Sequence, residues 1–283
     1  MTTAQDLLKT NYVSADINDT IASLLGKFKK AKQHFALVFD KNEYMGVVER
    51  RFLLTSRINV AEMKVKNVVK KRSKSKTPFY VPELCISDDV KKICKLMNAA
   101  NIHALPVLEK GKVLGVVRAW DLVQAISSEY KKVTCEQLAC LDLVTVKEND
   151  TISTVINAIS KHSIDHIPVV DTLGKTVGMI ALSDLLENPR IWGAEGQHVP
   201  KGASRQPGKR AGYQHGEKTS NMDLPIKNIM SKVNVCCTTP STTIPSAVKL
   251  MADGGVCSII LMQNGKAVGI LTMKDILADY AKS

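Results

Sequence analysis

The chain has 283 residues, of which 45% are hydrophobic, 5% aromatic and 23% charged, and its formal net charge is +12. This length and apolar content suffice for two hydrophobic cores. The longest apolar runs are strand-sized, as in Val256–Met262, which argues against a membrane span. The N-terminus has no basic segment followed by an apolar one, which argues against a secretory signal. Seven scattered cysteines indicate reduced thiols in a cytoplasm rather than a disulfide framework.

Four short apolar strands, each interrupted by a glycine, run directly into a helix pattern. These copies of one motif are Tyr44–Leu54, Val113–Val123, Thr176–Leu186 and Ala267–Leu277. Self-similarity of this kind indicates one small structural unit made four times. We expect the motif glycines to lie at strand ends; they are Gly46, Gly115, Gly178 and Gly269.

The repeated pattern extends upstream of each motif. A helix pattern comes first, with apolar residues three and four positions apart, as in Ile152–Ile159. A second apolar strand such as His166–Asp171 follows, and then a turn, which is clearest at Asn264–Gly265. Each unit is therefore predicted to run strand, helix, strand, turn, strand, helix.

This unit resembles the CBS domain, whose lead-in pattern also recurs here, at Ala4–Leu8, Val65–Val69 and Ile226–Met230. The resemblance covers nearly the whole chain. It implies an α/β fold in which four CBS repeats form two Bateman modules in a disc-like arrangement, with copies one and two in one module and copies three and four in the other. The length and layout are similar to those of stand-alone four-CBS proteins of archaea, a group that includes ribosome-hibernation factors.

The domain boundaries follow from the spacing of the motif glycines, which is 69, 63 and 91 residues along the chain. The last interval is longer because a glycine-rich segment follows Pro189, and such a segment cannot bury enough apolar surface to fold alone. The predicted division is 1–60 for CBS repeat 1, 61–128 for repeat 2 with a basic connector at 64–76, 129–189 for repeat 3, 190–220 for a basic glycine-rich insertion, and 221–283 for repeat 4.

Positive charge is concentrated in two connectors. Lys64–Lys76 has seven basic residues and no acid, and Arg190–Ser220 has six basic residues against two acids, so together they hold +11 of the net +12. Concentrated charge of this kind is typical of segments that bind a polyanion. The alternative is that both segments are solvated linkers. The candidate RNA-binding residues are Lys64, Lys66, Lys70, Lys71, Arg72, Lys74, Lys76, Arg190, Lys201, Arg205, Lys209, Arg210 and Lys218.

The resemblance also implies a nucleotide site in each repeat. In the family, a Ser or Thr after the glycine-containing strand bonds a phosphate, and an Asp three residues later bonds ribose hydroxyls. Only repeat 4 keeps both groups, as Thr272 and Asp275. The other copies have Glu49 with Phe52, Arg118 with Asp121, and Ala181 with Asp184.

Two alternatives remain open at these positions. Each Asp can simply be a helix N-terminal residue that the helix dipole favours. Arg118 can hold a phosphate or pair with Asp121. Glu49 places a negative charge where a phosphate would sit, so repeat 1 is expected to reject nucleotides.

Motifs for catalysis or metal binding are not found in the sequence. His162 and His166 need not share a face, because His166 opens a strand, and Cys135 with Cys140 lacks the spacing of a zinc or redox site. No Walker loop, G-x-S-x-G or H-E-x-x-H pattern is present. We therefore expect a binding protein rather than an enzyme, with no metal and no required cofactor.

Two functions follow from these features. In the first, the basic connectors dock the protein on ribosomal RNA or a ribosomal subunit, as a hibernation or dimerisation factor that regulates translation. In the second, the protein is an adenine-nucleotide sensor resembling the γ subunit of AMP-activated kinase, with AMP, ADP or ATP in repeat 4. Degenerate nucleotide motifs and localised charge favour the first. A homodimer through the CBS modules is a further expectation.

Overall fold

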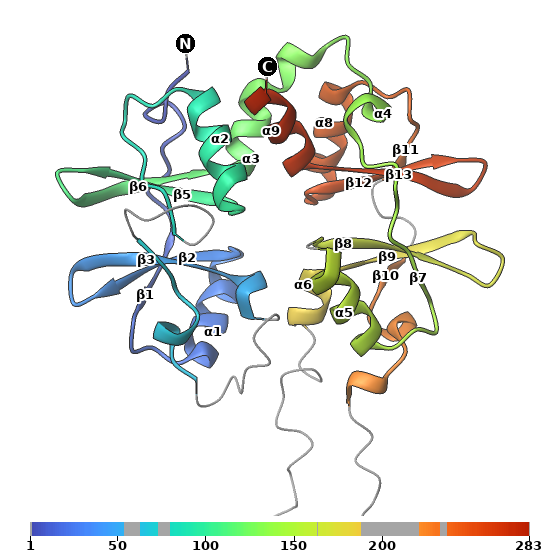
Figure 1. Ribbon diagram of the computed structural model, residues 1–283, viewed down its shortest axis with the longest axis horizontal. Helices are drawn as coiled ribbons and strands as arrows, with labels where there is room; N and C mark the ends of the chain where they lie inside the picture. Colours follow the sequence, from blue (N-terminus) through green and yellow to red (C-terminus); the bar gives the residue numbers. More distant parts are fainter. Residues whose placement is uncertain are drawn as a thin grey trace, which may run out of the picture.

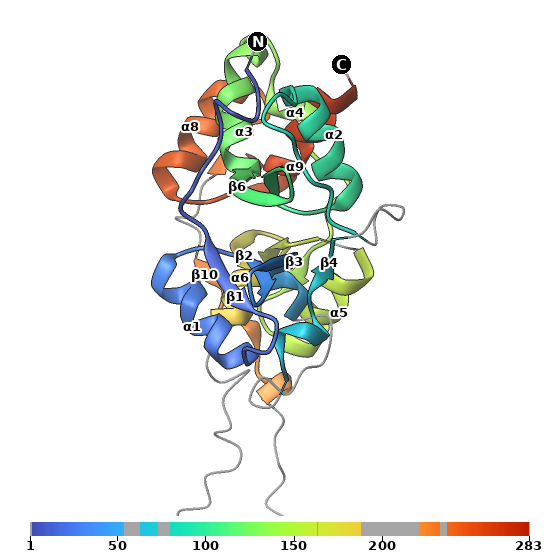
Figure 2. The same ribbon diagram turned by 90° about the vertical axis from the view of Figure 1, so that its left-hand side faces the viewer.

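The computed structural model of the chain describes residues 2–53, 63–72, 80–162, 164–187, 221–232 and 237–282. Within these ranges, four similar units lie at the corners of a flat assembly (Figure 1). The first unit lies below the second on one side, and the third lies below the fourth on the other. Both ends of the chain lie beside the second and fourth units, as the edge view also shows (Figure 2).

The first two units follow the predicted order of elements. The first consists of β1 (Val13–Asp16), α1 (Ile21–Ala31), β2 (Phe35–Asp40), β3 (Glu43–Glu49) and the 3-10 helix η1 (Arg50–Leu53). The second consists of α2 (Val90–Ala100), β5 (Ala104–Glu109), β6 (Lys112–Arg118) and α3 (Ala119–Ile126). In the second unit a single bridge from Leu84 to Val107 takes the place of a first strand.

The third and fourth units repeat this order. The third consists of β7 (Val146–Lys147), α5 (Ile152–His162), β8 (His166–Val170), β9 (Thr176–Ala181) and α6 (Leu182–Glu187). The fourth consists of β11 (Cys237–Thr238), α8 (Ile244–Gly254), β12 (Ser258–Gln263), β13 (Lys266–Thr272) and α9 (Met273–Lys282). The short elements outside the units are η2 (Val65–Asn67), β4 (Lys70–Lys71), η3 (Ser127–Tyr130), α4 (Cys135–Leu138), η5 (Asn221–Asp223), η6 (Ile226–Asn228) and β10 (Ser231–Lys232).

The strand β2 shows why the apolar runs of the sequence are continuous. Phe35 and Leu37 lie in a core that contains residues of units 2 and 4, whereas Ala36 and Val38 lie in a core with α1 and unit 3. Neighbouring side chains of a strand point to opposite faces, so every position is apolar only where both faces are covered. The sheets are therefore interior layers, and helices cover their outer faces (Figure 1).

The lead-in segments join the units in pairs. Lys9, ahead of unit 1, pairs with β6 of unit 2, and β4, ahead of unit 2, pairs with β3 of unit 1. In the other half, Cys140 pairs with β13 of unit 4, and β10 pairs with β9 of unit 3. Each unit thus extends the sheet of its neighbour. Units 1 and 2 form one module and units 3 and 4 the other, as predicted from the sequence.

The motif glycines lie inside strands, so the prediction that they mark strand ends is wrong. Gly115 lies in the middle of β6, where an added Cβ would be 2.6 Å from the carbonyl oxygen of Lys9. At Gly46 and Gly178 a Cβ would likewise meet a carbonyl oxygen, that of Lys70 or Ser231. Glycine is therefore required where a lead-in segment passes close to the strand.

Replacing Gly115 with alanine is expected to lower the free energy of unfolding by about 1–3 kcal/mol, because the methyl group would displace the Lys9 backbone from its two 2.9 Å hydrogen bonds with Val116. Gly26 in α1 is the control, since a Cβ there meets nothing within 4 Å. Gly26→Ala should instead stabilise the helix by about 0.5–1 kcal/mol. Urea unfolding measures both variants, and effects of the same sign would contradict the role given to Gly115.

Three features bear on the class of protein. No helix in the described ranges is long and apolar enough to cross a membrane. Those ranges also hold no group of three His, Cys, Asp or Glu side chains that could bind a metal ion. The six cysteines within them are thiols rather than half-cystines, while Cys236 lies outside them.

Candidate functional site

Thr272 and Asp275 lie where β13 runs into α9. The Oδ2 atom of Asp275 accepts hydrogen bonds from the backbone N–H and from the hydroxyl of Thr272, both at 2.7 Å. Asp275 is the third residue of α9, where the helix dipole favours a carboxylate. Burial raises the pKa of Asp275, although the hydrogen bonds from Thr272 oppose this shift.

A pocket of about 280 Å³ opens beside this pair, between units 3 and 4. Its apolar lining residues are Leu143, Val144, Ile164, Pro168 and Ile270. Its polar lining residues are His103, Asp142, Asp165, His166, Thr272, Lys274 and Asp275. Apolar surface with a few converging polar groups is typical of small-molecule sites. Thr272 and Asp275, the complete motif pair of the sequence, therefore line a pocket with the mixed apolar and polar lining of a small-molecule site.

The equivalent positions in repeats 2 and 3 differ from this arrangement. Arg118 donates to both oxygens of Asp121, with Nε–Oδ2 at 2.6 Å and Nη2–Oδ1 at 2.9 Å. The sequence left open whether Arg118 holds a phosphate or pairs with Asp121, and in the structure it pairs with Asp121. In repeat 3, Asp184 accepts the backbone N–H of Ala181 at 2.7 Å, the same contact that Asp275 makes in repeat 4.

Glu49, at the equivalent position of repeat 1, is buried and paired. It is 2% exposed, and it accepts hydrogen bonds from Arg51 Nε at 2.7 Å and from the backbone N–H of His103. Burial would raise the pKa of Glu49, but the charges of His103 and Arg51 and the hydrogen bonds from His103 together outweigh it and lower the pKa to about 2. The negative charge expected here is present, and its neighbours compensate it.

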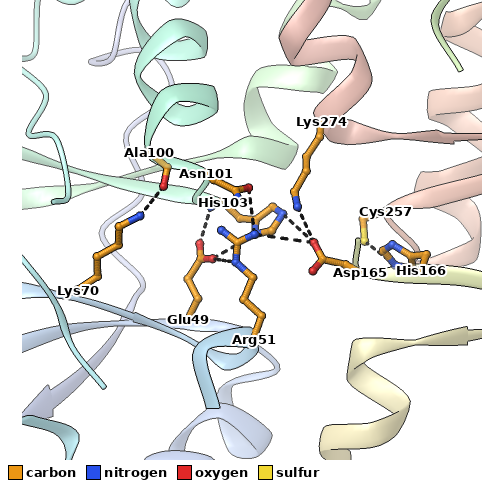
Figure 3. A network of polar contacts seen from close by, with 10 residues as sticks. All are labelled: Glu49, Arg51, Lys70, Ala100, Asn101, His103, Asp165, His166, Cys257 and Lys274. Atoms are coloured by element: carbon orange, nitrogen blue, oxygen red, sulfur yellow. Dashed lines mark hydrogen bonds and ion pairs between the residues drawn. The ribbon is translucent and has the colours of Figure 1, made fainter. Parts of the chain in front are cut away.

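Glu49 belongs to a polar network at the centre of the molecule (Figure 3). Lys274 Nζ lies 2.7 Å from Asp165 Oδ2, and Arg51 Nη1 and His103 Nε2 each lie 4.0 Å from the same oxygen. Burial opposes ionisation of Asp165, but mainly Lys274, with Arg51 and His103, holds the pKa of this carboxyl below its usual range. We call Glu49, Arg51, His103, Asp165 and Lys274 the central network. Each of the four units contributes to it.

Sequence analysis did not find the central network, although the alignment of the four copies held a signal. The residue directly before the second strand of each unit is polar or a thiol, and these residues are His34, His103, Asp165 and Cys257. Three of these, His103, Asp165 and Cys257, come near one another at the centre (Figure 3). A polar residue that recurs directly before a buried strand indicates such a meeting point, because buried polar groups need hydrogen-bond partners.

Cys257 and His166 lie side by side at the pocket, with Sγ and Nε2 3.5 Å apart. Burial raises the pKa of the Cys257 thiol to about 11 and lowers the pKa of His166 to about 4. Both groups are therefore neutral near pH 7. A catalytic cysteine needs a thiolate, so this pair does not have the character of a nucleophile and base.

The described part of the first basic connector is folded against the protein, whereas sequence analysis left open only RNA contact or a solvated linker. Lys70 Nζ donates to the carbonyl oxygen of Ala100 at 2.5 Å. Arg72 lies over the Tyr44 ring, 5.6 Å from its centroid, and its Nε is 2.8 Å from Glu83 Oε1. Lys70 and Arg72 are thus engaged within the chain.

The remaining candidate RNA-binding residues divide into two groups. Lys64, Lys66 and Lys71 are exposed. The others lie outside the described residues, and they are Lys74, Lys76, Arg190, Lys201, Arg205, Lys209, Arg210 and Lys218.

The family model of the CBS domain matches residues 76–128, 136–190 and 226–282, which together are more than half of the chain. The chain belongs to the CBS domain family. The matched ranges correspond to units 2, 3 and 4. Unit 1 has the same order of β1, α1, β2 and β3 but lies outside them, so a fourth CBS domain stays a prediction at the level of sequence.

Two solved structures share the fold along the chain. A Methanocaldococcus jannaschii protein, described as a proposed archaeal homologue of γ-AMPK, has a TM-score of 0.79 at 13% identity, covering 99% of this chain and 100% of its own. An uncharacterised conserved protein of Pyrococcus horikoshii has a TM-score of 0.64 at 18% identity, covering 99% and 100%. At these identities the similarity establishes the fold alone.

Relatives of known sequence match less completely. An uncharacterised protein of Methanocaldococcus jannaschii is 22% identical over 284 residues, which is 96% of this chain and 60% of that protein. The L-aspartate semialdehyde sulfurtransferase of the same organism is 28% identical over 146 residues, which is 49% of this chain and 28% of the enzyme. The chain therefore spans only part of the length of these relatives.

Proposed function

We propose that the protein is a regulatory CBS-domain protein whose repeat 4 binds an adenosine-containing ligand. The observation that carries this proposal is the position of Thr272 and Asp275, the complete motif pair, on the wall of the pocket between units 3 and 4. The nucleotide-sensing alternative from the sequence is thus favoured over docking on the ribosome.

The polar and apolar residues that line the pocket suit the two parts of a nucleoside, its ribose and its base. The carboxylate of Asp275 can accept hydrogen bonds from the two neighbouring hydroxyls of a ribose. The apolar lining residues, which include Val144 and Ile270, can pack against a purine base. A ligand held this way lies next to Lys274, which belongs to the central network joining the two modules. Occupancy of one pocket can therefore affect contacts in both halves of the molecule.

We propose a binding role without catalysis. Cys257 and His166, the thiol and imidazole at the pocket, are both held neutral. The enzyme-named relative reported above matches over 28% of its own length, so its activity does not transfer to this chain.

We do not propose docking on a ribosome, which the sequence favoured. Two of its described candidate residues, Lys70 and Arg72, make contacts within the chain instead.

Asp275→Ala is expected to weaken adenosine binding by about 1–3 kcal/mol, roughly 5- to 150-fold, because it removes the acceptor for the ribose hydroxyls. Asp184→Ala is the matched control, since Asp184 makes the same backbone contact in α6 but does not line the pocket. Isothermal titration calorimetry with adenosine measures both. Unchanged affinity in Asp275→Ala, or an equal loss in Asp184→Ala, would argue against the site.

A further inference from the structure

Asp165 fills the place where the positive groups of the other three units converge. Its Oδ2 atom lies 2.7 Å from Lys274 Nζ and 4.0 Å from both Arg51 Nη1 and His103 Nε2. Its side chain is 19% exposed, and it lines the pocket together with Lys274 and His103. A carboxylate built into the chain therefore already pairs with Lys274, the amine that lines the pocket and that a ligand phosphate would need (Figure 3).

The hydroxyl of Thr272 is also paired within the chain. It donates its proton to Asp275 Oδ2 at 2.7 Å, so it presents only acceptor lone pairs to the pocket. A phosphate oxygen is also an acceptor and gains nothing from such a hydroxyl. In the family motif this hydroxyl bonds a phosphate, whereas here the hydroxyl of Thr272 bonds Asp275.

The charges of the residues that line the pocket also disfavour a phosphate. Among the described residues that line it, the carboxylates of Asp142, Asp165 and Asp275 outnumber the single amine of Lys274. His166 is neutral because burial lowers its pKa to about 4, and His103 adds at most one positive charge. A phosphomonoester brings about −1.5 to −2 charges at pH 7 and would meet a wall that is already negative.

We infer that the repeat 4 site selects an adenosine-type ligand whose 5′ substituent is neutral or positively charged over a 5′-phosphorylated nucleotide. This inference rests on the proposed function and names its ligand class. Asp165 is the residue that sets the preference, because its carboxylate pairs with Lys274, the amine that lines the pocket.

Calorimetry on the wild-type chain with three probes that share one nucleoside tests the inference. Adenosine and 5′-amino-5′-deoxyadenosine are expected to bind, and AMP is expected to bind about tenfold more weakly or worse. AMP that binds as tightly as adenosine, or more tightly, would overturn the inference and leave the proposed function standing. Binding of none of the three would overturn both.

Asp165→Asn is expected to abolish the preference, because Lys274 loses its paired carboxylate and becomes available to a phosphate. AMP affinity should rise about tenfold while adenosine affinity stays within about threefold. Asp142→Asn is the matched control, since it removes the same charge from an exposed position outside the central network; its effect on AMP should be less than about threefold. Equal gains in the two variants would contradict the role of Asp165. The wild-type series decides the question even if Asp165→Asn does not fold.

Discussion

Replacing Glu49 with glutamine is expected to lower the free energy of unfolding by about 3–5 kcal/mol. Glu49 is 2% exposed and accepts hydrogen bonds from Arg51 and from the backbone of His103, so removing its charge leaves the Arg51 guanidinium, itself 12% exposed, without its closest anion. Glutamine keeps the size of the side chain, so the effect reports on charge rather than on a cavity. The loss is large because water cannot replace the missing partner at a buried site.

Glu43→Gln is the matched control for this substitution. Glu43 begins the same strand, β3, and is exposed. Its replacement should change the free energy of unfolding by less than about 0.5 kcal/mol. Urea unfolding at neutral pH measures both variants, and an effect of similar size in the two would show that the central network contributes no special stability.

Acid should remove the same stabilisation from the wild-type protein. The pKa of Glu49 falls from 4.5 to about 2 on folding, so the ionised carboxylate stabilises the fold fully above pH 4.5 and progressively less as the pH falls toward 2. A shift of this size corresponds to about 3 kcal/mol. The difference in free energy of unfolding between wild type and Glu49→Gln should therefore shrink by about that amount across this range.

Comparing the two proteins isolates Glu49 from other titrating groups. His166, whose pKa falls from 6.5 to about 4 on folding, also lowers stability as the pH drops through that interval, but it does so equally in both proteins. Urea unfolding at a series of pH values supplies the measurement. A difference that stays constant down to pH 2 would mean that folding does not lower the pKa of Glu49.

The fold and part of the site could be predicted because their signals are local. The order of strands and helices follows from apolar periodicity within each unit, and Thr272 and Asp275 are three residues apart on one strand–helix junction. The pairing of the units came from the family resemblance. The register of Lys9 with β6 and of Cys140 with β13 then gives the physical basis of that pairing.

The rest depends on residues that meet only in three dimensions. Gly115 is required by the backbone of Lys9, which lies more than a whole unit away along the chain. Asp165 and Lys274 form an ion pair across 109 positions, and neither stands out within its own segment. Whether Arg118 turns to a ligand or to Asp121 is a choice of rotamer, which residue types do not determine.

A crystal structure of the chain grown with saturating adenosine would test the central claim most directly. We expect one adenosine in the pocket between units 3 and 4, with its ribose hydroxyls on Asp275 and its base against apolar lining residues that include Val144 and Ile270. The carboxylate of Asp165 should remain on Lys274. Adenosine bound instead between units 1 and 2, or an empty pocket beside Thr272 under these conditions, would contradict the account.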